Sequence, residues 1–163
     1  KSSTGLLGRV SKENIMANEL TTTEVRIRQE RHHAPKVFNV QSRGLKMAKE
    51  IDVLARTDLI GAMVHYLDEG GENNLHSHTS SDAFWIVLEG EASFYGEGDA
   101  EIATLGPGGT LLIPRGTKYW FKKSSDQQAV VMRVWSDTPN VPDQRVEHAP
   151  ASDTIRKLVM NGA

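Results

Sequence analysis

Apolar and polar residues alternate in short stretches from Val37 to Trp135, and turn residues separate these stretches at intervals of roughly ten residues. This spacing predicts an all-β sandwich or barrel. A parallel α/β fold needs helices that alternate with the strands. The pattern shows no such helices, so this fold is not expected. Residues 45–54 fit either a bent strand or a helical turn. About nine strands are expected, at residues 36–40, 47–55, 59–67, 83–90, 91–96, 100–106, 110–114, 118–123 and 129–135.

The pattern divides the chain into an N-terminal arm (1–36), a barrel domain (37–136) and a C-terminal extension (137–163). Residues 23–28 alternate like a strand that adds to a partner's sheet, although Thr21 and Glu24 have the spacing of a helix capping box. After Trp135 three prolines and little periodicity indicate an extended surface connection. A short C-terminal helix is predicted at residues 155–160, with Ser152 as its cap.

Composition narrows the function classes. The 19 basic and 21 acidic side chains nearly balance, which argues against nucleic acid as a partner, since phosphate binding needs a basic surface. The chain has no cysteine, so a disulfide or a thiolate site is excluded. No apolar run reaches the ~20 residues of a membrane helix, and no secretory signal is visible. We therefore expect a soluble cytoplasmic protein.

His76 and His78 are the strongest candidates for a chemical site. In a strand, residues two apart point to the same face, so the two imidazoles can converge on one ion. Imidazole suits iron, manganese, nickel, copper and zinc, so the pair indicates a divalent transition metal without identifying it. A strand of β-branched and aromatic residues follows the pair and ends at Gly90.

The sequence resembles the cupin superfamily, which consists of small double-stranded β-helix barrels with two motifs. The matching residues are Gly70, His76, His78 and Gly90 in the first motif, and Gly108, Pro114 and Gly116 in the second. The resemblance implies a homodimer that binds a small molecule. It also implies a metal-dependent enzyme of the dioxygenase, isomerase, lyase, cyclase or decarboxylase type, but does not select among them.

Two of the four ligands familiar in that superfamily are absent. Counted from Gly90, the carboxylate position falls on Ala83, and counted from Gly116, the last histidine falls on Tyr119. Asp82 could replace the carboxylate if a one-residue β-bulge turned it inward. Together with the two histidines it would form a set suited to iron(II).

There are three alternatives to Asp82 as the additional metal ligand: Tyr119, His65, or loss of the metal. Tyr119 can be a ligand or a catalytic acid or base, because a nearby cation lowers the pKa of a phenol, and it can equally be an aromatic that fills the barrel. His65 lies in an apolar run, where it is either a ligand or a core residue, and the sequence does not fix its face. If the metal has been lost, the barrel is only a binding cavity.

Strand alternation predicts which side chains line the inside of the barrel. With Ala83 inward, Trp85 and Val87 point inward as well, and an inward Tyr119 implies an inward Phe121. Trp85 and Phe121 are thus expected to contact the substrate, and His65 is a further candidate for that contact.

Arg133 is a charged residue in an apolar strand. An outward, solvated guanidinium is the favoured interpretation, whereas an inward one would clamp a substrate carboxylate.

The sequence therefore predicts a homodimeric cupin that holds a metal through His76 and His78 and acts on a small organic molecule. A non-catalytic small-molecule-binding cupin is the alternative.

Overall fold

The computed structural model of the protein describes residues 34–69 and 71–149. Within these ranges it contains ten strands and one short 3₁₀ helix, which confirms the predicted all-β fold. The elements are β1 (Lys49–Arg56), β2 (Ile60–Leu67), β3 (Leu75–His78), β4 (Ala83–Glu89), β5 (Ala92–Tyr95), η1 (Glu97–Asp99), β6 (Glu101–Leu105), β7 (Thr110–Ile113), β8 (Trp120–Lys123), β9 (Ala129–Ser136) and β10 (Arg145–Ala149). The N-terminal strand expected at 23–28 and the C-terminal helix lie outside the described residues.

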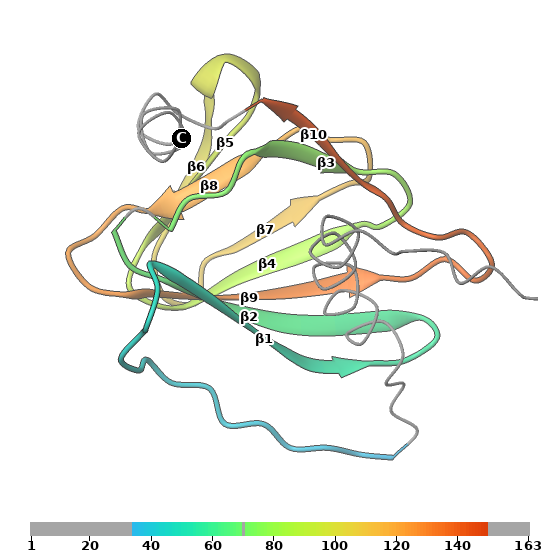
Figure 1. Ribbon diagram of the computed structural model, residues 1–163, viewed down its shortest axis with the longest axis horizontal. Helices are drawn as coiled ribbons and strands as arrows, with labels where there is room; N and C mark the ends of the chain where they lie inside the picture. Colours follow the sequence, from blue (N-terminus) through green and yellow to red (C-terminus); the bar gives the residue numbers. More distant parts are fainter. Residues whose placement is uncertain (1–33, 70, 150–163) are drawn as a thin grey trace, which may run out of the picture. The chain divides into compact units, whose positions relative to one another are not determined.

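Five antiparallel strands form the larger sheet, in the order β1-β2-β9-β4-β7 (Figure 1). Strand β9 lies in the middle and pairs with β2 along its whole length, from Ile60 opposite Ser136 to Leu67 opposite Ala129. On its other side β9 pairs with β4. A central strand is covered by neighbours on both edges, which explains the apolar sequence of β9.

The remaining strands form a second layer. A three-stranded sheet has the order β6-β5-β8, and β10 pairs with β3. A single bridge joins these two groups: the N–H of His76 donates to the carbonyl of Tyr119 at 3.0 Å, and the N–H of Tyr119 donates to the carbonyl of His76 at 2.9 Å. Strand β3 is therefore held between β10 and the start of β8.

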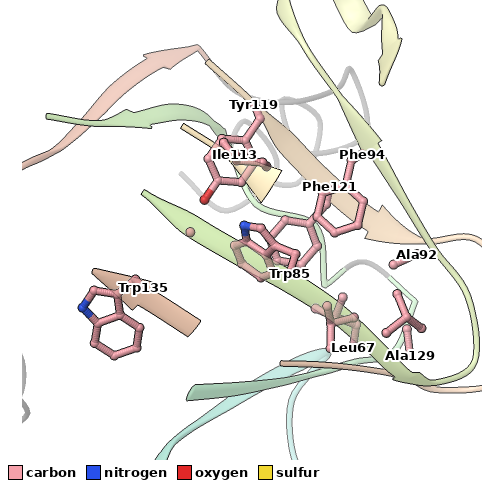
Figure 2. Packing of buried hydrophobic residues seen from close by; sticks show 12 residues of the cluster. Leu67, Trp85, Ala92, Phe94, Ile113, Tyr119, Phe121, Ala129 and Trp135 are labelled. Carbon is pink, nitrogen blue, oxygen red and sulfur yellow. The ribbon is translucent and has the colours of Figure 1, made fainter. Parts of the chain in front are cut away.

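The core lies between the two layers and is rich in aromatic side chains (Figure 2). In β4, Ala83, Trp85 and Val87 are buried while Phe84 is 50% exposed, so the predicted alternation is confirmed. The buried cluster consists of Leu67, Ala83, Trp85, Val87, Ala92, Phe94, Ile113, Tyr119, Phe121, Ala129, Val131 and Trp135.

The strand predicted at residues 36–40 is wrong, because this segment has no strand pairing. Val40 and the following Leu45 instead pack on the outer face of the larger sheet, against Val64, Tyr66 and Val130. Residues 49–56 form a strand and not a helical turn. The outer face of the sheet is thus partly covered by an irregular segment.

The extended surface connection predicted after Trp135 contains a strand. Residues 145–149 form β10, which pairs antiparallel with β3 so that Arg145 lies opposite His78 and Glu147 opposite His76. The irregular residues 137–144 lead from β9 to this strand. The second layer therefore includes residues well beyond position 136.

Two motif glycines have backbone conformations that favour glycine. Gly90 has a φ of 66°, and a Cβ there would lie 2.3 Å from the carbonyl oxygen of Gln128. Gly116 has a φ of 79°. Residues with a side chain rarely adopt such angles, so these glycines set the turns that end β4 and follow β7. The described residues include no helical segment with the length and hydrophobicity that a bilayer span requires.

Candidate functional site

His76 and His78 lie on β3 with their rings on the same side of the strand. The ring centroids are 5.4 Å apart and the planes are nearly perpendicular. The intervening Ser77 has its hydroxyl oxygen 2.9 Å from Nε2 of His148, on the neighbouring strand β10. The structure thus brings the two imidazoles together, as their spacing predicts.

The Nδ1 atoms of both rings are bound to fixed acceptors. Nδ1 of His76 donates to the carbonyl of Asn74 at 2.7 Å, and Nδ1 of His78 donates to the carboxylate of Asp143 at 2.5 Å. Nε2 of each neutral ring is then left with its lone pair, and no hydrogen bond within the described residues engages it. This is the usual arrangement of metal-binding histidines, whose second nitrogen donates to a carbonyl or carboxylate.

Burial keeps both rings neutral. It lowers the pKa of His76 to about 3, and the positive charge of Arg145 adds to the effect. Burial and the nearby Arg133 also lower the pKa of His78, although Asp143 acts in the opposite direction. A neutral imidazole is the form that binds a metal ion, so the site is ready for one at neutral pH.

Asp143 is a site residue that sequence reasoning missed. Partial burial alone raises the pKa of its carboxyl, but hydrogen bonds from the Ser80 N–H and from His78 bring the pKa below its usual value. It precedes β10 in a segment with no recognisable motif, 65 positions from its histidine. No local signal separates it from other surface aspartates.

Asp82 is in an ion pair with Arg115 and is not beside the histidines. Its carboxylate accepts the backbone N–H of Arg115 at 2.8 Å and the side-chain Nη2 at 2.6 Å. Strand β4 keeps a regular register from Ala83 to Val87 and has its register shift between Val87 and Glu89, and the carboxylate of Asp82 is nevertheless bound to Arg115. Asp82 therefore does not join His76 and His78 in a three-ligand metal site, contrary to the expectation from the sequence. Within 34–69 and 71–149, no three His, Asp or Glu side chains are grouped to hold a metal.

Tyr119 lies next to His76, with ring centroids 4.4 Å apart. It is only 1% exposed, and its hydroxyl has no hydrogen-bond partner in the part of the chain that the structure describes. Burial raises the pKa of the phenol, so the hydroxyl is protonated at neutral pH and can donate a hydrogen bond. The ring both fills the core and places a hydroxyl near the two histidines.

His65 points into the core from β2, which settles the face that the sequence left open. Its ring centroid lies 5.1 Å from that of Trp85 and 5.5 Å from that of Phe121. Neither ring nitrogen has a hydrogen-bond partner among the described residues. Burial holds the pKa of His65 well below its ordinary value, and Lys49 contributes in the same direction.

Arg133 is 7% exposed, so the favoured interpretation of a solvated guanidinium is wrong. It lies on β9 opposite Trp85. Its guanidinium carbon is 5.8 Å from the ring centroid of Trp85 and 5.3 Å from that of Trp135. These two indoles cover the cation and explain how it is tolerated inside an apolar strand.

A family model described as "Cupin domain" matches residues 63–135, from within β2 to within β9. Residues 63–135 are a cupin domain. The match includes His76, His78, Tyr119 and Arg133, and it confirms the resemblance inferred from the two motifs. No curated protein matches the sequence.

Solved structures at low sequence identity share the cupin fold. An uncharacterized conserved protein with a double-stranded β-helix domain from Klebsiella pneumoniae is 19% identical with a TM-score of 0.60, over 74% of this chain and 99% of that chain. A sugar phosphate isomerase from the cupin superfamily of Silicibacter pomeroyi is 18% identical with a TM-score of 0.51, over 66% and 82%. The lyase DddQ of Ruegeria pomeroyi, which acts on DMSP, is 21% identical with a TM-score of 0.50, over 60% and 51%. These likenesses confirm the double-stranded β-helix.

The two imidazoles of this cupin fit a divalent metal ion. Metal–nitrogen bonds of about 2 Å place each ring centre about 3 Å from a shared ion. Ring centres 5.4 Å apart satisfy this condition. Ala83, which is buried at the superfamily's carboxylate position, offers no donor atom. A metal bound by these two rings would therefore need Tyr119, water or a substrate at its remaining coordination positions.

Proposed function

We propose that this cupin is an enzyme that binds a divalent metal through Nε2 of His76 and His78 and acts on a small organic substrate inside the barrel. The observation that carries the proposal is the pairing of both Nδ1 atoms with fixed acceptors, Asn74 and Asp143. Those bonds orient the rings and direct the two unprotonated nitrogens to one side of β3.

The residues around the histidines have separate roles in this proposal. A bound metal would polarise a substrate oxygen as a Lewis acid. Tyr119, protonated and without a partner, donates a proton or a hydrogen bond to a substrate beside His76. Trp85 and Phe121, 4.7 Å apart between ring centroids, form an apolar wall and exclude water.

The named relatives are consistent with an enzyme and leave its reaction open. One is an isomerase and another is a lyase, so the same fold carries different reactions. The substrate and the reaction of this chain have to be found by experiment.

Metal content tests the proposal. The full chain is loaded with Zn²⁺, Mn²⁺ or Fe²⁺, dialysed, and measured by mass spectrometry of the metal. We expect about one equivalent in the native protein and none in the double variant His76→Gln plus His78→Gln. The matched control is Asp126→Asn, which changes an exposed side chain outside the site and should retain the metal. Equal metal in both variants would contradict the proposal.

A non-catalytic binding protein is the second candidate, and the buried Ala83 favours it because this position supplies no carboxylate ligand. It predicts that small molecules bind equally well to the metal-loaded and the chelator-treated protein. The metal-dependent enzyme predicts that binding weakens when the metal is removed. Titration of both forms with the same compound separates the two.

A further inference from the structure

Four side chains that contact one another in the barrel core have buried polar atoms with no hydrogen-bond partner among residues 34–69 and 71–149. They come from β2, β4, β9 and the residue before β8, and ring contacts connect them into one cluster. Figure 2 shows the Tyr119 hydroxyl and the Trp85 indole nitrogen on the side of the core that faces away from Ala92. The atoms are both ring nitrogens of His65, Nε1 of Trp85, Oη of Tyr119, and Nε and Nη2 of Arg133.

Such a cluster is costly without a ligand. A buried polar group without a partner destabilises a fold by about 1–3 kcal/mol, and a buried charge costs more. Arg133 is the extreme member, because no carboxylate lies within ion-pair distance of it in the described part of the chain. Unpaired polar groups are rare in native cores, and a missing ligand accounts for a group of them in one place.

The chemistry of the cluster is that of an anion site. The indole nitrogen of Trp85 can only donate, the protonated phenol of Tyr119 donates, and the guanidinium of Arg133 only donates. A neutral His65 supplies one further N–H. Donors grouped around the buried guanidinium of Arg133 match an anion that accepts several hydrogen bonds.

We propose that the barrel binds a monocarboxylate, with its two oxygens on Nε and Nη2 of Arg133 and with Tyr119 and Trp85 as additional donors. These two guanidinium nitrogens lie on one edge and match a carboxylate side-on. The inference rests on the proposed function, since it names the class of substrate.

The surrounding side chains determine what the carboxylate is attached to. Trp85 and Trp135 flank the guanidinium, and Phe121 stacks behind Trp85. An apolar or planar group next to the carboxylate is therefore favoured. The polar atoms are shielded from water in the present conformation, so binding requires one of these aromatic side chains to move.

The test uses formate, acetate and benzoate, with benzamide as the uncharged analogue of benzoate. Binding to the full metal-loaded chain is followed by calorimetry and by tryptophan fluorescence, because Trp85 must change its environment. We expect saturable binding of at least one carboxylate, benzoate first, and none of benzamide. Arg133→Lys keeps the charge but loses the two-nitrogen edge, and should weaken binding by about tenfold or more. Arg115→Lys is the matched control on an exposed arginine and should leave binding unchanged.

A second variant separates ligand binding from folding. Arg133→Met removes an unpaired buried charge, so it should raise the melting temperature of the ligand-free protein while abolishing carboxylate binding. A lower melting temperature would show that Arg133 is a structural residue and would overturn the inference. Tyr119→Phe should weaken carboxylate binding severalfold.

The outcomes also separate this inference from the metal proposal. If the native protein retains its metal but binds none of the three carboxylates, or binds inorganic phosphate more tightly, the inference is wrong and the metal proposal stands. If a carboxylate binds through Arg133 while no metal is retained, the metal proposal is wrong and the anion site stands.

Discussion

The imidazole of His78 donates a hydrogen bond of 2.5 Å to the carboxylate of Asp143, from the loop that precedes β10. We predict that Asp143→Asn lowers metal affinity by about 10- to 100-fold, because a neutral amide is a weaker acceptor and orients the ring less firmly. A competition titration with a zinc chelator measures the change.

Asp126→Asn is the control for this variant, since Asp126 is exposed and lies outside the site. Equal zinc affinity in Asp143→Asn and the native chain would show that the hydrogen bond does not support a metal ligand.

The ion pair of Asp82 with Arg115 leads to the opposite expectation. Both partners are substantially exposed, with side-chain exposures of 36% and 52%, and pairs of this kind contribute little to stability. Asp82→Ala should leave the metal content unchanged and shift the urea midpoint only slightly. Loss of metal in this variant would show that Asp82 is a metal ligand together with the two histidines.

The buried histidines make the fold sensitive to acid. The pKa values of His65, His76 and His78 are all lowered, chiefly by burial, whereas in the unfolded chain they titrate near pH 6.5. Below that pH the unfolded state therefore binds more protons than the folded state. The free energy of unfolding should fall by up to about 1.4 kcal/mol per pH unit for each histidine as the pH decreases. For His76 the loss continues to its folded pKa of about 3.

Urea denaturation between about pH 7 and pH 5 measures this slope before most carboxylates titrate. His65→Leu should make the slope shallower than that of the native chain. Identical slopes in the two proteins would mean that His65 is protonated equally in the folded and unfolded states.

A comparison of alanine substitutions at Gly90 and Gly98 separates the cost of backbone strain from the cost of steric overlap. Gly90 and Gly98 both have a φ of 66°, but a Cβ at Gly98 meets no atom within 4 Å, whereas one at Gly90 would lie 2.3 Å from the Gln128 oxygen. Gly98→Ala should cost about 1 kcal/mol of unfolding free energy from strain alone. Gly90→Ala should cost at least about 3 kcal/mol, because the backbone must also shift. Similar losses in chemical denaturation would refute the role assigned to close packing at Gly90.

The expected homodimer stays a prediction, and the structure suggests where to test it. Phe84 and Leu112 are 50% and 51% exposed and lie opposite each other on β4 and the edge strand β7. If this face is the dimer interface, Phe84→Glu plus Leu112→Glu should give a monomer in sedimentation experiments. Ile102→Glu, at a comparably exposed position on β6, should not. If the double variant sediments with the same mass as the native protein, Phe84 and Leu112 do not form a dimer interface.

Alternation along the chain predicts most of the strands, because burial of one face imposes a period of two. The inward positions of β4 follow from this rule alone. Residues 36–40 also alternate, but Val40 packs on a sheet face without pairing, and hydrophobicity does not distinguish these two cases. Nor does it predict β10, whose pairing partner β3 lies about 70 positions earlier.

The candidate site is only partly predictable for the same reason. The imidazole pair and the absence of a carboxylate at Ala83 follow from motif spacing. The inward guanidinium of Arg133 does not, because burial of an isolated cation is unfavourable unless flanking groups such as Trp85 and Trp135 compensate, and those contacts appear only in three dimensions.

The pairing of β3 with β10 has a consequence for the order in which the protein matures. The chain segment with His76 and His78 leaves the ribosome well before Asp143 and β10, and the strands up to β9 can pair before β10 is synthesised. His78 therefore acquires its carboxylate partner late, after the larger sheet has formed. If the two histidines bind a metal as proposed, a nascent chain that ends before Asp143 should therefore capture it more weakly than the finished protein.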